Sequence, residues 1–259
     1  MLELRDICKE LDGKAVLKGV SFRVPAGETL VIVGASGAGK SVMLQHIAGL
    51  MAPDQGTITI DGVDLCAARG QRLEAVRDRF GMLFQSGALI NWMNVRDNIA
   101  LPLYEKTKLS DDEIRRIVDE KLELVGLQGT GDKMPAEISG GMRKRAGLAR
   151  AIVRDPSLIL YDEPTSGLDP VLSRTIDQLI QTLQRDLGVT AVVVTHDLRS
   201  AFAVANNVAM LHQGEIVELA PPEHFRNSRL RVVREFVDAQ FGKTDEAPNQ
   251  NVQQGLETP

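Results

Sequence analysis

The chain has 259 residues, of which 43% are hydrophobic, and it carries a formal net charge of -5. This size suits one large α/β domain or two small ones, and the acidic balance gives no electrostatic reason to expect nucleic-acid binding. The two cysteines, Cys8 and Cys66, form neither a disulfide framework nor a metal-ligand pattern, so we expect reduced thiols in a cytosolic protein.

The first third of the chain alternates strand and turn signals. Short β patterns at residues 2–7 and 16–24 precede a Pro-Ala-Gly turn. Residues 28–33 end in a wholly apolar run, which is typical of a strand buried on both faces of a parallel sheet. The later elements predicted in this third are a helix at residues 41–50 and strands at residues 56–60 and 80–84.

The middle of the chain predicts a helical insert over residues 86 to about 155. Ser110 and Glu113 form a capping-box pattern, in which the serine accepts from the glutamate amide and the glutamate reaches back. Apolar residues then recur at helical spacing until Gly126 ends the run. We therefore expect a helical subdomain inserted between elements of the sheet.

Strand signals resume after the insert. Buried strands are predicted at residues 158–162 and 191–195, and a hairpin at residues 207–211 and 215–219. Residues 1–241 are thus expected to form the folded domain. Residues 242–259 are polar and without aromatics, so we expect a tail that is disordered when free, and either flexible or partner-binding.

A phosphate-binding loop lies between the strand at 28–33 and the following helix. Residues 34–41, Gly-Ala-Ser-Gly-Ala-Gly-Lys-Ser, fit the pattern G-x-x-x-x-G-K-[ST]. Glycines let backbone amides turn toward phosphate oxygens, and the helix N-terminus favours the same anion. Lys40 is expected to bind the β- and γ-phosphates of ATP, and Ser41 to ligate Mg²⁺. The residues predicted to contact nucleotide here are Gly34, Ala35, Ser36, Gly37, Ala38, Gly39, Lys40, Ser41 and Val42.

Two acids end the apolar strand at residues 158–162. The carboxyl end of a parallel strand is where α/β sheets bind ligands, so Asp162 is expected to hold Mg²⁺ directly or through water. Glu163 is expected to act as general base or to position the attacking water.

A third motif lies in the helical insert: Ser139-Gly140-Gly141-Met142. Together with the two motifs above, it indicates a family. Serine followed by two glycines can open a helix and offer amides to an anion. In this order, the motifs resemble those of the ABC ATPase family, whose signature is usually S-G-G followed by glutamine. Met142 departs from that form.

The resemblance covers residues 1 to about 240 and implies further roles by position. Gln85 matches the glutamine that senses metal and attacking water, and His196 matches the histidine that contacts the γ-phosphate. Ser166-Gly-Leu-Asp169 matches the family's loop that crosses the dimer interface. Leu11 and Val16 lie where the family binds the base. Leucine replaces the usual aromatic ring and forgoes stacking worth about 0.5–1.5 kcal/mol, so base selectivity is expected to be loose.

The resemblance also implies the fold and the assembly. The expected fold is an α/β P-loop ABC ATPase with a mainly parallel core sheet, an N-terminal antiparallel β subdomain and the inserted helical subdomain. A second copy of the chain is expected to complete each site. The phosphate loop of one copy then faces Ser139, Gly140 and Gly141 of the other, with two ATP molecules between them.

Three stretches, residues 82–89, 134–145 and 162–170, resemble one branch in particular, the ATPases of the Mla/Mkl phospholipid transporters. This implies ATP hydrolysis that drives lipid transport across the bacterial envelope. The implied partners are an integral permease, an MCE-domain lipid-binding protein and, as an option, a small regulatory subunit.

The membrane role is expected to depend on those partners. No stretch reaches the roughly 20 predominantly apolar residues of a spanning helix, and the N-terminus has no signal-peptide pattern. The expected location is therefore the cytoplasmic face of the inner membrane.

Alternatives remain open from the sequence. The chain could serve an importer of polar solutes such as amino acids, or be a soluble ABC ATPase without a transport role. Trp92 and Met93 could either contact the permease or pack within the core. Residues 143–145, Arg-Lys-Arg, are expected to form a solvated helix face.

Overall fold

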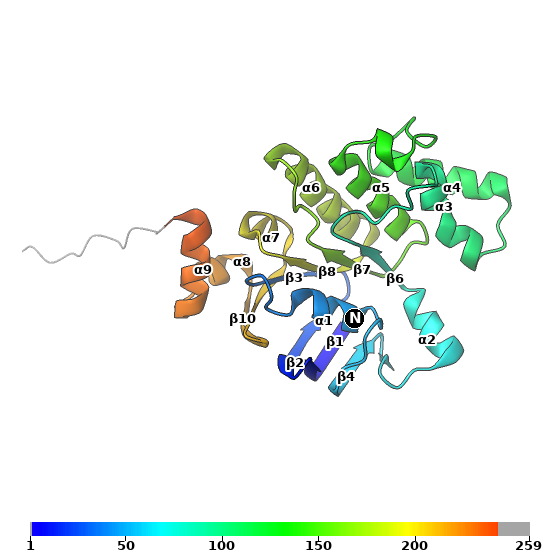
Figure 1. The fold of residues 1–259 in the computed structure, drawn as a ribbon. Helices are drawn as coiled ribbons and strands as arrows, with labels where there is room; N and C mark the ends of the chain where they lie inside the picture. The colour runs from blue at the N-terminus through cyan, green and yellow to red at the C-terminus, as the bar shows by residue number, and fades with distance from the viewer. Residues whose placement is uncertain (1, 243–259) are drawn as a thin grey trace, which may run out of the picture.

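The computed structural model describes residues 2–242, which fold into two β-sheets with helices packed around them (Figure 1). The strands are β1 Leu2–Leu11, β2 Lys14–Val24, β3 Thr29–Val33, β4 Gln55–Ile60, β5 Val63–Asp64, β6 Phe80–Leu83, β7 Leu158–Asp162, β8 Thr190–Thr195, β9 Asn207–His212 and β10 Glu215–Ala220. The helices are α1 Lys40–Ile47, α2 Gly70–Arg77, α3 Val95–Lys106, α4 Asp111–Leu124, the 3-10 helix η1 Pro135–Glu137, α5 Gly140–Ile152, α6 Pro170–Leu187, α7 Leu198–Val204, α8 Pro222–Arg226 and α9 Arg231–Phe241. The predicted tail lies outside the described residues from position 243 onward.

The strands form one mainly parallel and one antiparallel sheet, as the sequence predicted. The first sheet has the order β10-β9-β3-β8-β7-β6, and all its pairs are parallel except the β9–β10 hairpin. The second has the order β2-β1-β4-β5 and is antiparallel throughout. The α/β fold with an N-terminal antiparallel subdomain is therefore confirmed.

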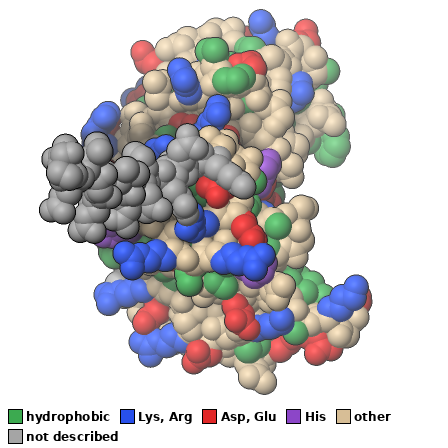
Figure 2. Space-filling view, turned by 90° about the vertical axis from the view of Figure 1, so that its left-hand side faces the viewer, with side chains coloured by type: hydrophobic (Ala, Val, Ile, Leu, Met, Phe, Trp, Pro, Cys, Tyr) green, Lys and Arg blue, Asp and Glu red, His purple; other side chains and the backbone are tan. Residues whose placement is uncertain are grey.

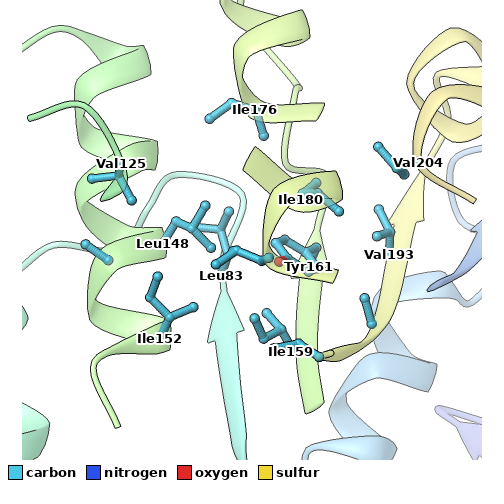
Figure 3. Packing of buried hydrophobic residues seen from close by; sticks show 14 of the residues in the cluster. Leu83, Val125, Leu148, Ile152, Ile159, Tyr161, Ile176, Ile180, Val193 and Val204 are labelled. Atoms are coloured by element: carbon cyan, nitrogen blue, oxygen red, sulfur yellow. The ribbon is translucent and has the colours of Figure 1, made fainter. Parts of the chain in front are cut away.

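The larger sheet is buried on both faces because its strands are apolar on both sides. In β3, Val31 and Val33 pack into the cluster that includes α5 and α6, whereas Leu30 and Ile32 face α1 and the antiparallel sheet. Figure 3 shows the first cluster, where Leu148 and Ile152 of α5 and Ile176 and Ile180 of α6 surround Leu83, Ile159, Tyr161 and Val193 of the sheet. This packing fixes the carboxyl ends of the strands, where the site lies.

The predicted helical insert is present as α3, α4, η1 and α5, the group above the sheet in Figure 1. The capping box forms as expected, with the Ser110 side chain accepting from the Glu113 amide and the Glu113 carboxylate accepting from the Ser110 amide. Helix α5 lies so close to the loop after β6 that a Cβ at Gly147 would be 2.6 Å from the carbonyl oxygen of Gly87.

Helices α2 and α6 to α9 were not among the predicted elements. The signals for α6 are nevertheless visible: Asp169 caps the amides of Val171 and Leu172, Pro170 occupies the first turn, and Gly188 ends the helix with φ 63°. None of the helices in residues 2–242 is long and apolar enough to cross a membrane. On the face at the α9 end, Lys and Arg are interspersed with Asp and Glu rather than gathered into a patch of one sign (Figure 2).

Candidate functional site

Four parallel strands bring the predicted site residues to one edge of the sheet. Lys40 follows β3, Gln85 follows β6, Asp162 ends β7 and His196 follows β8. Parallel strands end at a common edge, which is where sheets of this class bind ligands. An open cleft of about 540 Å³ lies there.

Most of the predicted residues line this cleft. Its lining consists of Leu11, Val16, Ser36, Gly37, Gly39, Lys40, Ser41, Val42, Gln85, Glu163 and His196. Gly34, Ala35 and Ala38 belong to the same loop, and Asp162 contacts Ser41, without being among the lining residues. The four residues Ser139, Gly140, Gly141 and Asp169 are also outside the lining.

The phosphate loop wraps around its own lysine. The Lys40 ammonium donates to the carbonyl oxygens of Gly34 at 2.8 Å and Ala35 at 3.2 Å, and it lies 3.8 Å from Glu163 Oε1. Gly34 is required because a Cβ there would lie 2.3 Å from the carbonyl oxygen of Leu211. Gly39 adopts φ 103° directly before α1, a backbone conformation that residues other than glycine rarely adopt.

Ser41 and Asp162 place two oxygen donors side by side at the mouth of the loop. The Ser41 hydroxyl donates to Asp162 Oδ1 at 3.3 Å. Burial raises the pKa of Asp162, and the neighbouring Glu163 charge adds to this, while the Ser41 hydrogen bond and the Lys40 charge oppose it. A half-buried carboxylate of this kind is stabilised as an anion by a nearby cation.

These donors fit Mg²⁺ bound together with a nucleotide. Within residues 2–242 there is no group of three or more His, Cys, Asp or Glu side chains that could hold a metal alone. Mg²⁺ typically uses one or two carboxylates and takes its other ligands from phosphates and water. A serine hydroxyl beside one carboxylate is therefore a suitable protein share of the coordination.

Glu163 sits in an unusual backbone conformation at the end of β7. Its φ is 47°, in the left-handed region that is uncommon for a residue other than glycine. One carboxylate oxygen lies 2.8 Å from His196 Nδ1 and accepts from Thr195 Oγ1 at 3.3 Å. The turn thus points Glu163 at Lys40 and His196.

Gln85 joins the cleft to the loop after β7. Its side-chain amide donates to the Ser166 hydroxyl at 3.3 Å. Ser166 belongs to the loop that leads to Asp169, which caps α6. The predicted metal-sensing residue therefore contacts the predicted interface loop within one chain.

Lys144 corrects the expectation of a solvated basic face on α5. Its side chain is only 5% exposed, and its ammonium donates to the carbonyl oxygens of Glu163, Pro164 and Ser166 at 3.2, 2.9 and 2.6 Å. Burial lowers the pKa of Lys144, opposed by the charge of Glu163. Arg145 is also engaged, through the carbonyl oxygens of Val125 and Gly126. The expectation was wrong because the run of basic residues in the sequence does not show that carbonyl groups 19 to 22 positions away lie within reach of Lys144.

The remaining predicted residues have different surroundings. Ser139 caps α5 by accepting from the Met142 amide at 3.2 Å, and Gly141 packs against Leu172 of α6. Trp92 is 82% exposed, so it does not pack in the core of this chain.

Comparison with known proteins agrees with the motifs. The sequence profile described as "ABC transporter" matches residues 17–166. The chain is 46% identical over 237 residues to the "Probable ribonucleotide transport ATP-binding protein mkl" of Mycobacterium leprae, covering 92% of this chain and 68% of that protein. It is 41% identical over 238 residues to the "Intermembrane phospholipid transport system ATP-binding protein MlaF" of Escherichia coli K12, covering 92% and 88%.

A solved structure is similar to most of the chain. It is the dimeric structure of a post-hydrolysis state of the ATP-binding cassette MJ0796 bound to ADP and Pi. It superposes with a TM-score of 0.79 at 32% identity, covering 86% of this chain and 99% of that one.

Proposed function

The chain belongs to the ABC transporter family as an ATP-hydrolysing subunit, and we propose that the transporter it drives moves phospholipid or a related lipid through the bacterial envelope. The observation that best accounts for ATP hydrolysis is the cleft in which Lys40, Glu163 and His196 meet. The lipid cargo is supported by the MlaF relative, whose name specifies phospholipid, and by the three stretches that resemble this branch.

The name of the mkl relative specifies ribonucleotide transport, so a polar cargo is the second candidate. Lipid is favoured because the stretches at residues 82–89, 134–145 and 162–170 resemble the phospholipid-transport branch. The proteins and lipids that co-purify with the chain from membranes separate the two cargoes.

The side chains of the cleft have complementary roles toward ATP. Lys40 would exchange its bonds to the Gly34 and Ala35 carbonyls for phosphate oxygens, as a mobile point charge can. Glu163 would accept a proton from the attacking water or orient it, while His196 would donate to the γ-phosphate. Leu11 and Val16, which also line the cleft, would contact the base.

Mg²⁺ would be held by Ser41 and Asp162, with Gln85 beside them. When bound, it would supply charge neutralisation on the phosphates.

A second copy of the chain would complete the site. Ser139 and Gly141 are outside the cleft of their own chain, yet Ser139 opens a helix whose N-terminal amides suit an anion. The similar MJ0796 cassette is a dimer in its ADP- and Pi-bound structure. We infer a symmetric pair in which each signature segment contacts the ATP held by the partner.

The permease is proposed to dock beside Gln85. A groove of about 320 Å³ there is lined by Phe84, Leu101, Pro102 and Arg150, among others, and Trp92 is exposed in the following loop. An MCE-domain protein would join the complex through the permease. A small regulatory subunit would bind a surface of the chain outside the cleft. The chain would then lie at the cytoplasmic face of the inner membrane.

Purification of the tagged chain from detergent-solubilised membranes tests this proposal. We expect an integral permease and an MCE-domain protein in the eluate by mass spectrometry, together with phospholipid. A permease with a soluble solute-binding protein in place of the MCE protein would favour a polar cargo. Recovery of the chain without any integral protein would contradict the transporter role.

A further inference from the structure

The short loop that carries His196 is held at both ends by its own chain. Asp197 caps α7 by accepting from the amides of Arg199 at 2.8 Å and Ser200 at 3.4 Å. The Asp197 amide itself donates to Thr195 Oγ1 at 3.1 Å. These bonds leave the carbonyl of His196 and the amide of Leu198 to be paired by something else.

Gln240, in the last turn of α9, pairs both groups. Its amide nitrogen donates to the His196 carbonyl oxygen at 2.7 Å, and its amide oxygen accepts from the Leu198 amide at 2.8 Å. We call these two bonds the Gln240 clamp. A planar carboxamide that uses its donor and its acceptor on one backbone segment fixes the orientation of that segment as well as its position.

The last turn of α9 is itself anchored, so the clamp has a fixed base. The ring of Phe241 stacks on Phe202 of α7 with a centroid separation of 5.7 Å and an interplanar angle of 7°. Phe202 in turn meets the buried Phe225 of α8 edge-on at 6.2 Å. The guanidinium of Arg226 lies 5.3 Å from the Phe241 centroid. Because its neighbours on α7 and α8 hold this turn in place, the clamp transmits the position of α9 to the histidine loop.

The clamped segment controls two contacts to Glu163. His196 Nδ1 lies 2.8 Å from Glu163 Oε2, and the His196 backbone amide lies 3.4 Å from the same oxygen. A shift of the backbone at residue 196 therefore moves the imidazole and changes its distance to Glu163 at the same time.

We propose that Gln240 is a positioning residue for His196, through which the C-terminal helix α9 sets the rate of ATP hydrolysis without touching the nucleotide. Gln240 is not among the residues that line the cleft. The inference rests on the proposed role of His196 toward the γ-phosphate. It makes α9 an input to catalysis, because any partner that displaces its last turn displaces the histidine loop.

The test compares Gln240→Met with the full-length wild-type chain in its transporter complex. Methionine keeps the length and the apolar stem of the side chain but removes both hydrogen bonds. We expect kcat for ATP to fall about 10-fold, because small misplacements of a catalytic group are costly, while KM and ATP affinity change less than about two-fold. Glu235→Gln is the matched control, since Glu235 lies on the same helix and pairs with the exposed Arg231 at 2.7 Å; it should hydrolyse ATP normally.

A double-mutant cycle separates positioning from a merely structural effect. If Gln240 acts through His196, then Gln240→Met combined with His196→Ala should be no slower than His196→Ala alone. Gln240→Glu keeps the acceptor for the Leu198 amide but sets a carboxylate oxygen against the His196 carbonyl, so it should also lower kcat. If Gln240→Met lowers the thermal unfolding midpoint, the kcat of Gln240→Glu is used in its place to test the positioning role.

The outcomes distinguish this inference from the function on which it rests. A slow His196→Ala variant beside a Gln240→Met variant with wild-type kcat would overturn the clamp alone, as would losses that multiply in the double variant. Wild-type turnover by His196→Ala would overturn the proposed role of His196 itself, and the clamp with it.

Discussion

At Glu163 the backbone leaves the geometry of β7 and adopts φ 47°. Successive side chains of a regular strand point to opposite faces, so Asp162 and Glu163 could not both contact the phosphate loop, at Ser41 and Lys40, if β7 continued unchanged. The left-handed turn redirects Glu163 toward Lys40 and His196. The pair of acids was predictable from the sequence, because an apolar strand ends there. The strained turn was not, because nothing in the side-chain pattern signals a positive φ at a glutamate.

Lys144 gives a prediction at the same scale. Its ammonium donates to the carbonyl groups of Glu163, Pro164 and Ser166, of which the bond to Pro164 is fully buried. Lys144→Met removes these three hydrogen bonds, although the Glu163 carbonyl still accepts from the Ser166 amide. The free energy of unfolding should therefore fall by about 1–3 kcal/mol, and ATP turnover should fall with it as the loop loosens. Urea unfolding and phosphate release measure the two effects.

Lys108→Met is the control for Lys144, because Lys108 is exposed and the substitution removes the same charge. An equal loss of stability in both variants would mean that the buried bonds of Lys144 contribute nothing specific.

Among the elements, α5 shows how packing reverses a local preference. Gly147 lies inside this helix, where alanine would normally add up to about 1 kcal/mol of stability. A Cβ at this position would lie 2.6 Å from the carbonyl oxygen of Gly87 and 3.0 Å from its Cα. Gly147→Ala should therefore destabilise the protein by about 1–3 kcal/mol, since the loop after β6 must move. A raised midpoint of urea unfolding would contradict the close approach.

Helices α6 and α7 are joined by a buried pair that makes stability depend on pH. Ser200 donates to Asp177, and burial raises the pKa of this carboxyl, with the Asp197 charge adding to it and the Ser200 hydrogen bond opposing it. Between the unfolded and the raised folded pKa, the native state binds more protons, so this group's contribution to stability declines as pH rises through that window.

Asp177→Asn removes the titration and keeps an acceptor for Ser200. The variant should be more stable than wild type near neutral pH, by on the order of 1 kcal/mol, and this advantage should shrink toward about pH 4. Urea unfolding at the two pH values measures it. An advantage that is the same at both pH values would show that Asp177 does not titrate as described.

What the sequence predicts at this scale depends on how local the signal is. The apolar run in β3, the capping box at Ser110 and the hairpin of β9 and β10 all arise from neighbouring residues, and each was found. The Gln240 clamp joins positions that are 42 and 44 residues apart, and it uses backbone groups that have no sequence signature. Contacts of this kind become visible only in the folded chain.

At the scale of the whole molecule, the cleft of one chain contains the phosphate loop but not the signature residues. In the proposed dimer, each site takes Glu163 from one chain and Ser139 from the other. When one chain carries a Glu163 substitution and its partner a Ser139 substitution, both defects lie in the same site. The second site of the dimer stays intact. Two inactive variants can therefore restore one active site when they pair, which is impossible if each site lies within a single chain.

We therefore expect Ser139→Arg and Glu163→Gln chains to be inactive separately but active when paired. Dimers that contain one of each, isolated in the complex through two different tags, have one intact site and should hydrolyse ATP at about half the wild-type rate. Pairing Glu163→Gln with a chain that carries both substitutions leaves neither site intact, so that control should stay inactive. If the mixed dimers were as inactive as the separate variants while still binding ATP, independent composite sites built from two chains would be ruled out.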